Sequence, residues 1–202
     1  GDGRRSTLRA SRLPAPLLER LQCVLHDMDA AYERAAAAHG FVCSGCSTSC
    51  CRTRFHHHTL LEYLYLRDGF SELPAGRREG LRANAAAVAA PHGQAALSGA
   101  DPRRMCPLNA EGRCVLYAHR PMICRLHGIP HELRPPGRPA QQSPGCEEFH
   151  RRCGRPDRPL LDRTPLYTEL ARLEAECRRV LKLRRKIRMT IAEMLLDDGG
   201  LS

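Results

Sequence analysis

Four cysteines crowd into nine residues of this chain, and their spacing constrains the fold more than any other feature. They are Cys43, Cys46, Cys50 and Cys51. A Cys-x2-Cys pair on a turn that contains glycine can aim both sulfurs at one ion, which is typical of zinc and iron–sulfur sites. Adjacent Cys50 and Cys51 point in different directions, so they suit two metals, or one metal and a neighbouring site, better than a bond to each other.

A second irregular region, residues 101–155, is rich in Cys, Pro, Gly, Arg and His and has little periodicity. It supplies Cys106, Cys114, Cys124 and Cys146. A loop of this length inside a compact domain is improbable unless something other than a hydrophobic core holds it. We therefore expect eight cysteines to bind metal and tie two halves of the chain together, with each structural site contributing on the order of 10 kcal/mol to folding.

Three cysteines remain outside this set. Cys23 and Cys177 lie beside the apolar stripes of helical stretches, so we expect both to be small buried residues. Cys153 lies among arginines, whose charge favours a thiolate, and it is either a spare ligand or a reactive thiol.

Helical periodicity covers most of the remaining sequence. Apolar spacing predicts an amphipathic helix over 16–39, followed by Gly40 at its C-terminus. Shorter helices are expected over 57–68, stopped by Gly69, and over the Ala-rich stretch 75–90, which ends before Pro91. A long amphipathic helix is expected over 162–188, and the capping box of Thr190 with Glu193 starts a last short helix that ends at 196. We predict a mainly α fold: a small helical scaffold with two Cys-rich irregular metal-binding regions and little strand.

The predicted organisation is one domain with a loose start. Residues 1–13 form a flexible N-terminus, and residues 14–198 form a single metal-stabilised domain. Within that domain the cysteine cluster occupies 41–150 and a C-terminal basic helix occupies 162–196.

The charge is strongly positive and unevenly spread. The chain has 32 Lys and Arg against 22 Asp and Glu, and its near-exclusive use of Arg is typical of a GC-rich bacterial genome. Residues 151–188 hold 13 basic and 5 acidic side chains, a net charge of +8. The stretch 178–188 is predicted to be a basic helix. It is either a solvated face or a surface for nucleic acid or an acidic protein, although it lacks aromatics for base stacking.

No apolar run approaches the roughly 18 residues that a membrane span needs. No signal peptide is visible in residues 1–12, and we expect the chain to be cytoplasmic, where thiols stay reduced. Clustered cysteines in that compartment are more often metal ligands than disulfides.

The joint pattern over about residues 41–150 resembles the YkgJ-like cysteine-cluster family, a zinc- or iron-chelating CxxCxxCC domain. The run from Cys43 to Cys51 carries one part of the resemblance, with three residues between Cys46 and Cys50 where the family name implies two. The second part is Cys106-Pro107-Leu108, then GRCVLYAHRPMICR over 112–125 and Gly145-Cys146. The resemblance implies eight metal-binding cysteines: Cys43, Cys46, Cys50, Cys51, Cys106, Cys114, Cys124 and Cys146.

The metal and its division among the cysteines stay open at this point. Zinc in closed four-thiolate sites is the first choice, and iron or an iron–sulfur cluster is the alternative. Four histidines are either polar side chains of loops and helix ends or extra metal ligands: His57, His119, His127 and His131. Arg120 and Arg125 lie close to Cys124 in sequence and suit the neutralisation of thiolates.

No motif assigns a catalytic residue. The sequence lacks a Gly-rich phosphate loop, a GxSxG turn and an HExxH helix, so whether the chain is an enzyme stays open. Three functions fit: a metal-binding protein, an iron–sulfur redox protein or enzyme, and a zinc-stabilised module that binds nucleic acid or another partner.

Overall fold

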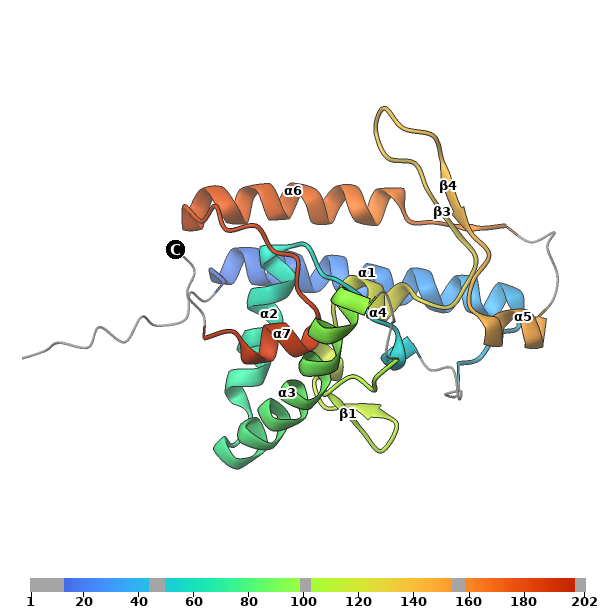
Figure 1. Cartoon of the computed structure of the whole chain (residues 1–202). Helices are drawn as coiled ribbons and strands as arrows, with labels where there is room; N and C mark the ends of the chain where they lie inside the picture. Colours follow the sequence, from blue (N-terminus) through green and yellow to red (C-terminus); the bar gives the residue numbers. More distant parts are fainter. Residues whose placement is uncertain (1–12, 44–49, 99–102, 154–158, 199–202) are drawn as a thin grey trace, which may run out of the picture.

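The computed structural model describes residues 13–43, 50–98, 103–153 and 159–198 (Figure 1). This part of the chain contains seven α-helices and five strands of two or three residues, which confirms the mainly α prediction. The helices are α1 Ala15–His39, α2 Leu60–Glu72, α3 Ala75–Ser98, α4 Met122–Leu126, α5 Glu147–Cys153, α6 Thr164–Leu181 and α7 Ile191–Leu196. The strands are β1 Asn109–Ala110, β2 Arg113–Cys114, β3 His131–Leu133, β4 Gln141–Ser143 and β5 Leu161–Asp162.

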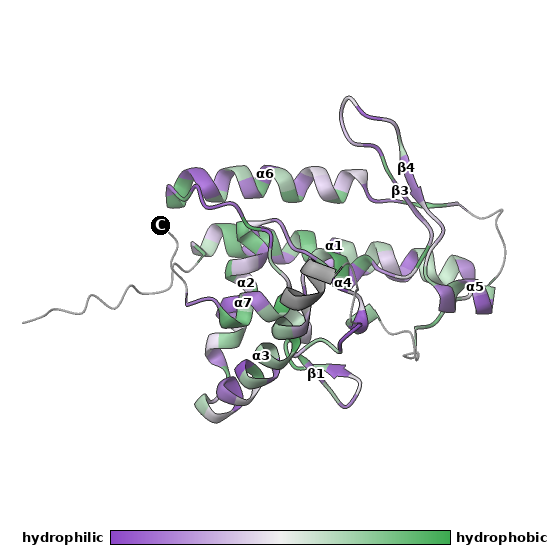
Figure 2. Cartoon of the chain, viewed as in Figure 1, coloured by the Kyte–Doolittle hydropathy of each residue, from purple (hydrophilic) through white to green (hydrophobic). Residues whose placement is uncertain are grey.

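Helices α1 and α6 lie side by side in opposite directions and form one layer of the molecule (Figure 1). Both helices carry hydrophilic and hydrophobic residues along their length (Figure 2), and the apolar residues of α1 are buried at Leu17, Leu21 and Met28. Gly40 ends α1 with φ of 64°, a left-handed conformation that glycine adopts at no steric cost. The predicted helix and its stop signal are both confirmed.

Helix α2 differs from its predicted bounds of 57–68. It begins at Leu60, because the Thr59 side chain accepts a hydrogen bond from the backbone of Glu62 at the first turn. It also continues through Gly69 instead of stopping there. A β-carbon at Gly69 would lie 2.5 Å from the ring of His119, so this glycine serves close packing rather than helix termination. The His119 ring in turn lies 4.5 Å from the ring of Tyr65.

Helix α3 continues through Pro91 to Ser98, so the predicted stop at Ala90 is wrong. The alanines before Pro91 are strong helix formers, and α3 packs against α7. Helix α6 ends at Leu181, because Lys182 adopts a left-handed conformation with φ of 54°. The basic stretch 178–188 is therefore helical only at its start, which corrects the predicted basic helix. Helix α7 begins at Ile191, and Thr190 before it forms the predicted capping box with Glu193.

The strands form two small sheets in the region that sequence analysis left irregular. Strands β1 and β2 make a hairpin in which Asn109 pairs with Cys114. Strand β3 lies between β4, which is antiparallel, and β5, which is parallel. Each sheet borders one of the cysteine-bearing segments, so the short strands fix the backbone around the sulfurs.

The contact between α2 and the segment around His119 can be tested by glycine substitution. We predict that Gly69→Ala lowers the free energy of unfolding by about 2 kcal/mol, because the new methyl group overlaps a ring that is itself packed. Gly80→Ala in α3 is the control: no atom lies within 4 Å of its added β-carbon, and we expect it to raise stability by about 0.5–1 kcal/mol. Urea unfolding measures both. Equal effects of the two substitutions would contradict this packing.

Candidate metal centre

Four of the predicted ligands lie together although they come from distant segments. Cys51 lies in the 3₁₀ turn η1, Cys50–Arg52, and Cys106 directly precedes the β1–β2 hairpin, which contains Cys114. Cys124 lies in α4. The backbone N–H of Cys106 donates to the carbonyl of Cys51 at 2.7 Å, which joins the two cysteine-bearing regions directly. We name Cys51, Cys106, Cys114 and Cys124 the first cysteine group.

The electrostatics of the first cysteine group also reflect the proximity of its sulfurs. Burial raises the pKa of Cys124, and Cys106, Cys114 and Cys51 raise it further. Burial likewise raises the pKa of Cys106 to about 12, with further contributions from Cys51 and Cys114. A thiol is hard to ionise where other sulfurs crowd it, because like charges would repel each other in a poorly solvated place. A bound cation would offset the repulsion between ionised sulfurs and so favour the thiolate form of these cysteines.

Backbone N–H groups point at several of these sulfurs. The N–H groups of Leu108 and Asn109 hydrogen-bond to Cys106, and that of Leu116 hydrogen-bonds to Cys114, each favouring the ionised sulfur. The N–H of Phe149 donates to the sulfur of Cys146 at 3.4 Å. Hydrogen bonds to sulfur from the residues just after a cysteine are one of the ways in which proteins tune metal-bound thiolates.

The second cysteine group consists of Cys43, Cys50 and Cys146 around the side chain of Tyr32. Burial raises the pKa of the Tyr32 hydroxyl, and Cys43, Cys146 and Cys50 raise it further. A β-carbon built on Gly128 would lie 3.5 Å from the Tyr32 hydroxyl and 3.7 Å from the Cys146 sulfur. The two groups adjoin at Cys50, whose pKa is raised first by its side-chain hydrogen bond with Cys51.

Cys46, the remaining predicted ligand, lies outside the described residues. Within the described ranges, no three Cys, His, Asp or Glu side chains converge closely enough to hold a metal ion. The sulfurs of each group are therefore neighbours without yet facing one common point. The donors present in each group are thiols, a type that fits zinc or an iron–sulfur cluster.

Three other cysteines lie outside the two groups as defined, although Cys153 packs against the same small core as Cys146 and Tyr32. Cys177 is fully buried in α6, as predicted. Cys23 is exposed on α1, so the prediction that it is buried is wrong. It falls next to the buried stripe of α1 rather than within it. Cys153 is the last residue of α5, where it packs against the small core of Ala36, Phe41, Ile129 and Phe149.

Arg120 lies close enough to the first cysteine group to favour its thiolates. Burial raises the pKa of Cys114 and Cys124, and Arg120 opposes that rise at both. Its guanidinium lies 3.6 Å from the ring centre of the exposed Tyr117 and 3.5 Å from a carboxylate oxygen of Asp29. Arg125 is buried and pairs with the same carboxylate of Asp29. Asp29 on α1 thereby holds both arginines of the Cys124 segment.

The predicted histidines lie in buried or half-buried positions. His57 is buried, and its backbone pairs with that of Met189 at 2.8 and 3.1 Å. Burial lowers its pKa to about 4, with His58 and His56 lowering it further. Burial also lowers the pKa of His127 and His131, and the charge of Arg163 adds to this effect. At neutral pH these lowered values favour uncharged imidazoles.

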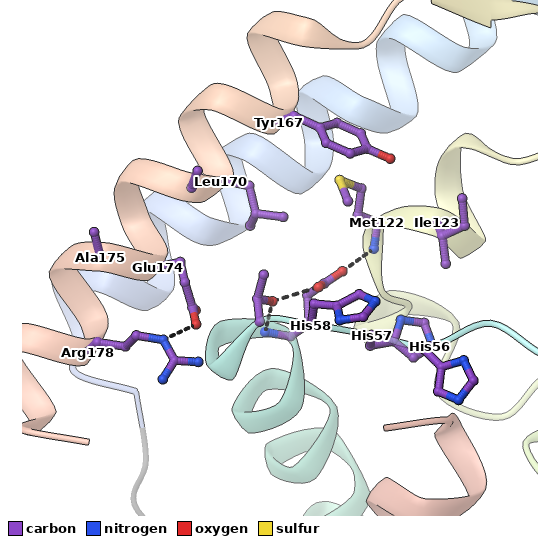
Figure 3. Close-up of a pocket in the computed structure, with 13 residues that line it drawn as sticks. His56, His57, His58, Met122, Ile123, Tyr167, Leu170, Glu174, Ala175 and Arg178 are labelled. Atoms are coloured by element: carbon purple, nitrogen blue, oxygen red, sulfur yellow. Dashed lines mark hydrogen bonds and ion pairs between the residues drawn. The ribbon is translucent and has the colours of Figure 1, made fainter. Parts of the chain in front are cut away.

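A cavity of about 480 Å³ is bounded by α6, α4 and the residues before α2 (Figure 3). Its wall includes Ile123, the residue before Cys124. Its two carboxylates are engaged by the chain itself. Glu62 accepts hydrogen bonds from the Met122 N–H at 2.8 Å and the Thr59 hydroxyl at 2.6 Å. Glu174 accepts the first two N–H groups of α2 at 2.8 and 3.0 Å.

Sequence reasoning missed Tyr32, Asp29 and Glu62. No local pattern could reveal that the first two approach cysteines and arginines from another segment. Glu62 did carry a signal, because Thr59-x-x-Glu62 has the spacing of a helix capping box. The Glu62 carboxylate instead accepts a hydrogen bond from the first N–H of α4. The residue that precedes α4, Pro121, provides no side-chain cap for that N–H.

Comparisons with known proteins leave the geometry as the sole guide to function. No protein-family model, curated protein or solved structure matches this chain. Among the described residues, every helix is too short or too polar to cross a membrane.

The role of Glu62 in fixing α4 can be measured through stability. We predict that Glu62→Ala lowers the free energy of unfolding by about 2 kcal/mol, because it leaves the Met122 N–H without its acceptor. Glu62→Gln keeps an acceptor oxygen and should lose less. Glu176→Ala is the control: it removes only a partly exposed ion pair with Arg20 and should cost below about 1 kcal/mol. If Glu62→Ala costs no more than Glu176→Ala in urea unfolding, Glu62 does not hold α4.

Proposed function

We propose that this protein binds zinc or iron through a cluster of eight cysteines. One observation carries the proposal: Cys51, Cys106, Cys114 and Cys124 come from segments far apart in sequence and lie as neighbours. The hydrogen bond between the backbones of Cys106 and Cys51 supports this proposal. The backbone N–H groups that point at Cys106 and Cys114 support it as well.

The donor set determines which metals fit. Thiolates are soft ligands that select zinc or iron–sulfur clusters over magnesium or calcium. A zinc ion with four thiolates carries a formal charge of about −2, and a nearby arginine is the fitting counter-charge. Arg120 opposes the rise in pKa that burial causes at Cys114 and Cys124, and Asp29 holds its side chain in position. A site closed by four thiolates leaves no position for a substrate, so we propose a structural or storage role for this metal.

The eight cysteines divide naturally between two sites. The first cysteine group supplies four ligands for one metal. The second cysteine group supplies Cys43, Cys50 and Cys146, and we assign Cys46 to it because the Cys43-x2-Cys46 spacing suits one shared ion. Adjacent Cys50 and Cys51 then serve different metals. The resemblance to the YkgJ-like cysteine-cluster family agrees with this ligand set and stays part of the proposal.

Single cysteine substitutions test the proposal. We expect about two zinc ions per chain, or the equivalent iron and sulfide, in protein purified without oxygen and analysed by elemental analysis. Cys106→Ser or Cys124→Ser should lose about one metal, because each removes one of four ligands of the first site. Cys50→Ser should lose the other. Cys23→Ser is the matched control: this exposed thiol lies on α1, outside both groups, and the variant should keep full metal content.

Two outcomes would overturn the proposal. Full metal content in both Cys106→Ser and Cys124→Ser would exclude the first cysteine group as a site. A wild-type chain without metal, folded and reduced, would exclude metal binding altogether. The visible absorption spectrum separates the two metals: zinc sites are colourless, whereas an iron–sulfur cluster absorbs broadly and would favour the redox alternative.

A further inference from the structure

The segment between α6 and α7 carries a basic feature that metal binding does not use. After Lys182 turns the chain out of α6, residues 183–188 form no helical turn (Figure 1). The segment runs back toward α7 and meets His57 through an antiparallel bridge at Met189. Because the helix stops at Leu181, the side chains that follow do not spread around a helix.

Exposure alternates along this segment. Leu183, Arg185 and Ile187 are buried or half-buried, whereas the residues between them are exposed. The exposed residues are Lys182, Arg184, Lys186 and Arg188. Since exposed and less exposed residues alternate, Arg184, Lys186 and Arg188 point to the same outward side, and the exposed Lys182 precedes them at the left-handed turn. We name Lys182, Arg184, Lys186 and Arg188 the basic row.

The inward side of the segment is firmly attached. Arg178 donates to the carbonyl of Arg185 at 2.7 Å, and the side chain of Arg185 pairs with Asp197 at 2.8 Å. The backbone of Met189 exchanges two hydrogen bonds with that of His57. These contacts hold the basic row in position before any partner arrives, which lowers the entropy cost of binding.

The two inward arginines are neutralised, and the basic row is not. Glu174 pairs with Arg178, and Asp197 pairs with Arg185. None of the ion pairs within the described ranges involves Lys182, Arg184, Lys186 or Arg188. Four exposed, unneutralised cations within seven residues of a chain with net charge +10 attract a polyanion.

We propose that the basic row binds the phosphate backbone of single-stranded nucleic acid. Alternate residues of an extended chain lie about 6.6 Å apart, a spacing comparable with that of successive phosphates along an extended strand. Arginine forks and lysine ammonium groups are both suited to phosphate oxygens. The segment lacks aromatic side chains, so it contacts the backbone without stacking on bases and reads no sequence.

The test measures anisotropy of a fluorescent oligothymidine with the full, metal-loaded chain over a salt series starting at about 50 mM. Four phosphate contacts on a single strand predict a slope of log K against log salt of roughly −3. The quadruple variant Lys182→Gln, Arg184→Gln, Lys186→Gln and Arg188→Gln should bind at least about 10-fold more weakly and lose most of that slope. The charge-matched control is Arg34→Gln, Arg77→Gln, Arg103→Gln and Arg138→Gln, all exposed residues elsewhere, and it should bind like the wild type.

Three results would overturn the inference. Equal weakening of both quadruple variants would mean that net charge alone attracts the oligonucleotide. A flat salt dependence of the wild type would exclude phosphate contacts, and this readout does not depend on how the variants fold. Displacement of the oligonucleotide by polyglutamate as readily as by unlabelled oligothymidine would point to an acidic protein instead.

Discussion

The hydrogen bond from the Cys106 N–H to the Cys51 carbonyl joins the parts on which the rest of the structure depends. It connects the cysteine-rich loop after α1 to the irregular region that follows α3. The second region packs Leu108, Leu116 and Leu126 into the main hydrophobic core, and its Cys106 and Cys114 pack against that core. Cys124 and Cys114 complete the same neighbourhood, where the proposed metal would add to the stability that this apolar packing provides.

Two carboxylates, one buried and one half-buried, attach this neighbourhood to the helical scaffold. Glu174 of α6 accepts the first N–H groups of α2, and Glu62 of α2 accepts the first N–H of α4. Each carboxylate caps a helix other than its own and satisfies backbone donors that would otherwise be unpaired. Three helices are thereby fixed in a chain of contacts that ends at α4. Since Cys124 lies on α4, the scaffold positions one sulfur of the first cysteine group through these polar contacts together with the burial of Leu126 in the core.

Local sequence predicted the features that depend on local chemistry. The helix that ends at Gly40 and the capping box at Thr190 follow from periodicity and capping residues, which act within a few positions of the chain. Helix α2 continues through Gly69, where the ring of His119, distant in sequence, packs closely. The glycine that local sequence marks as a helix end is therefore a packing contact. The candidate site divides in the same way: the spacing identified its cysteines, whereas the approach of Tyr32 to the second cysteine group is a property of the folded chain alone.

The most direct test of the central claim is X-ray absorption at the edge of the metal that copurifies with the full chain. The account predicts a first shell of sulfur alone, at about 2.3 Å for zinc, because all the proposed ligands are cysteines. A shell of oxygen and nitrogen atoms, or metal present only in traces in folded and reduced protein, would contradict it. Such a result would leave the cysteine groups as neighbours that share no ion.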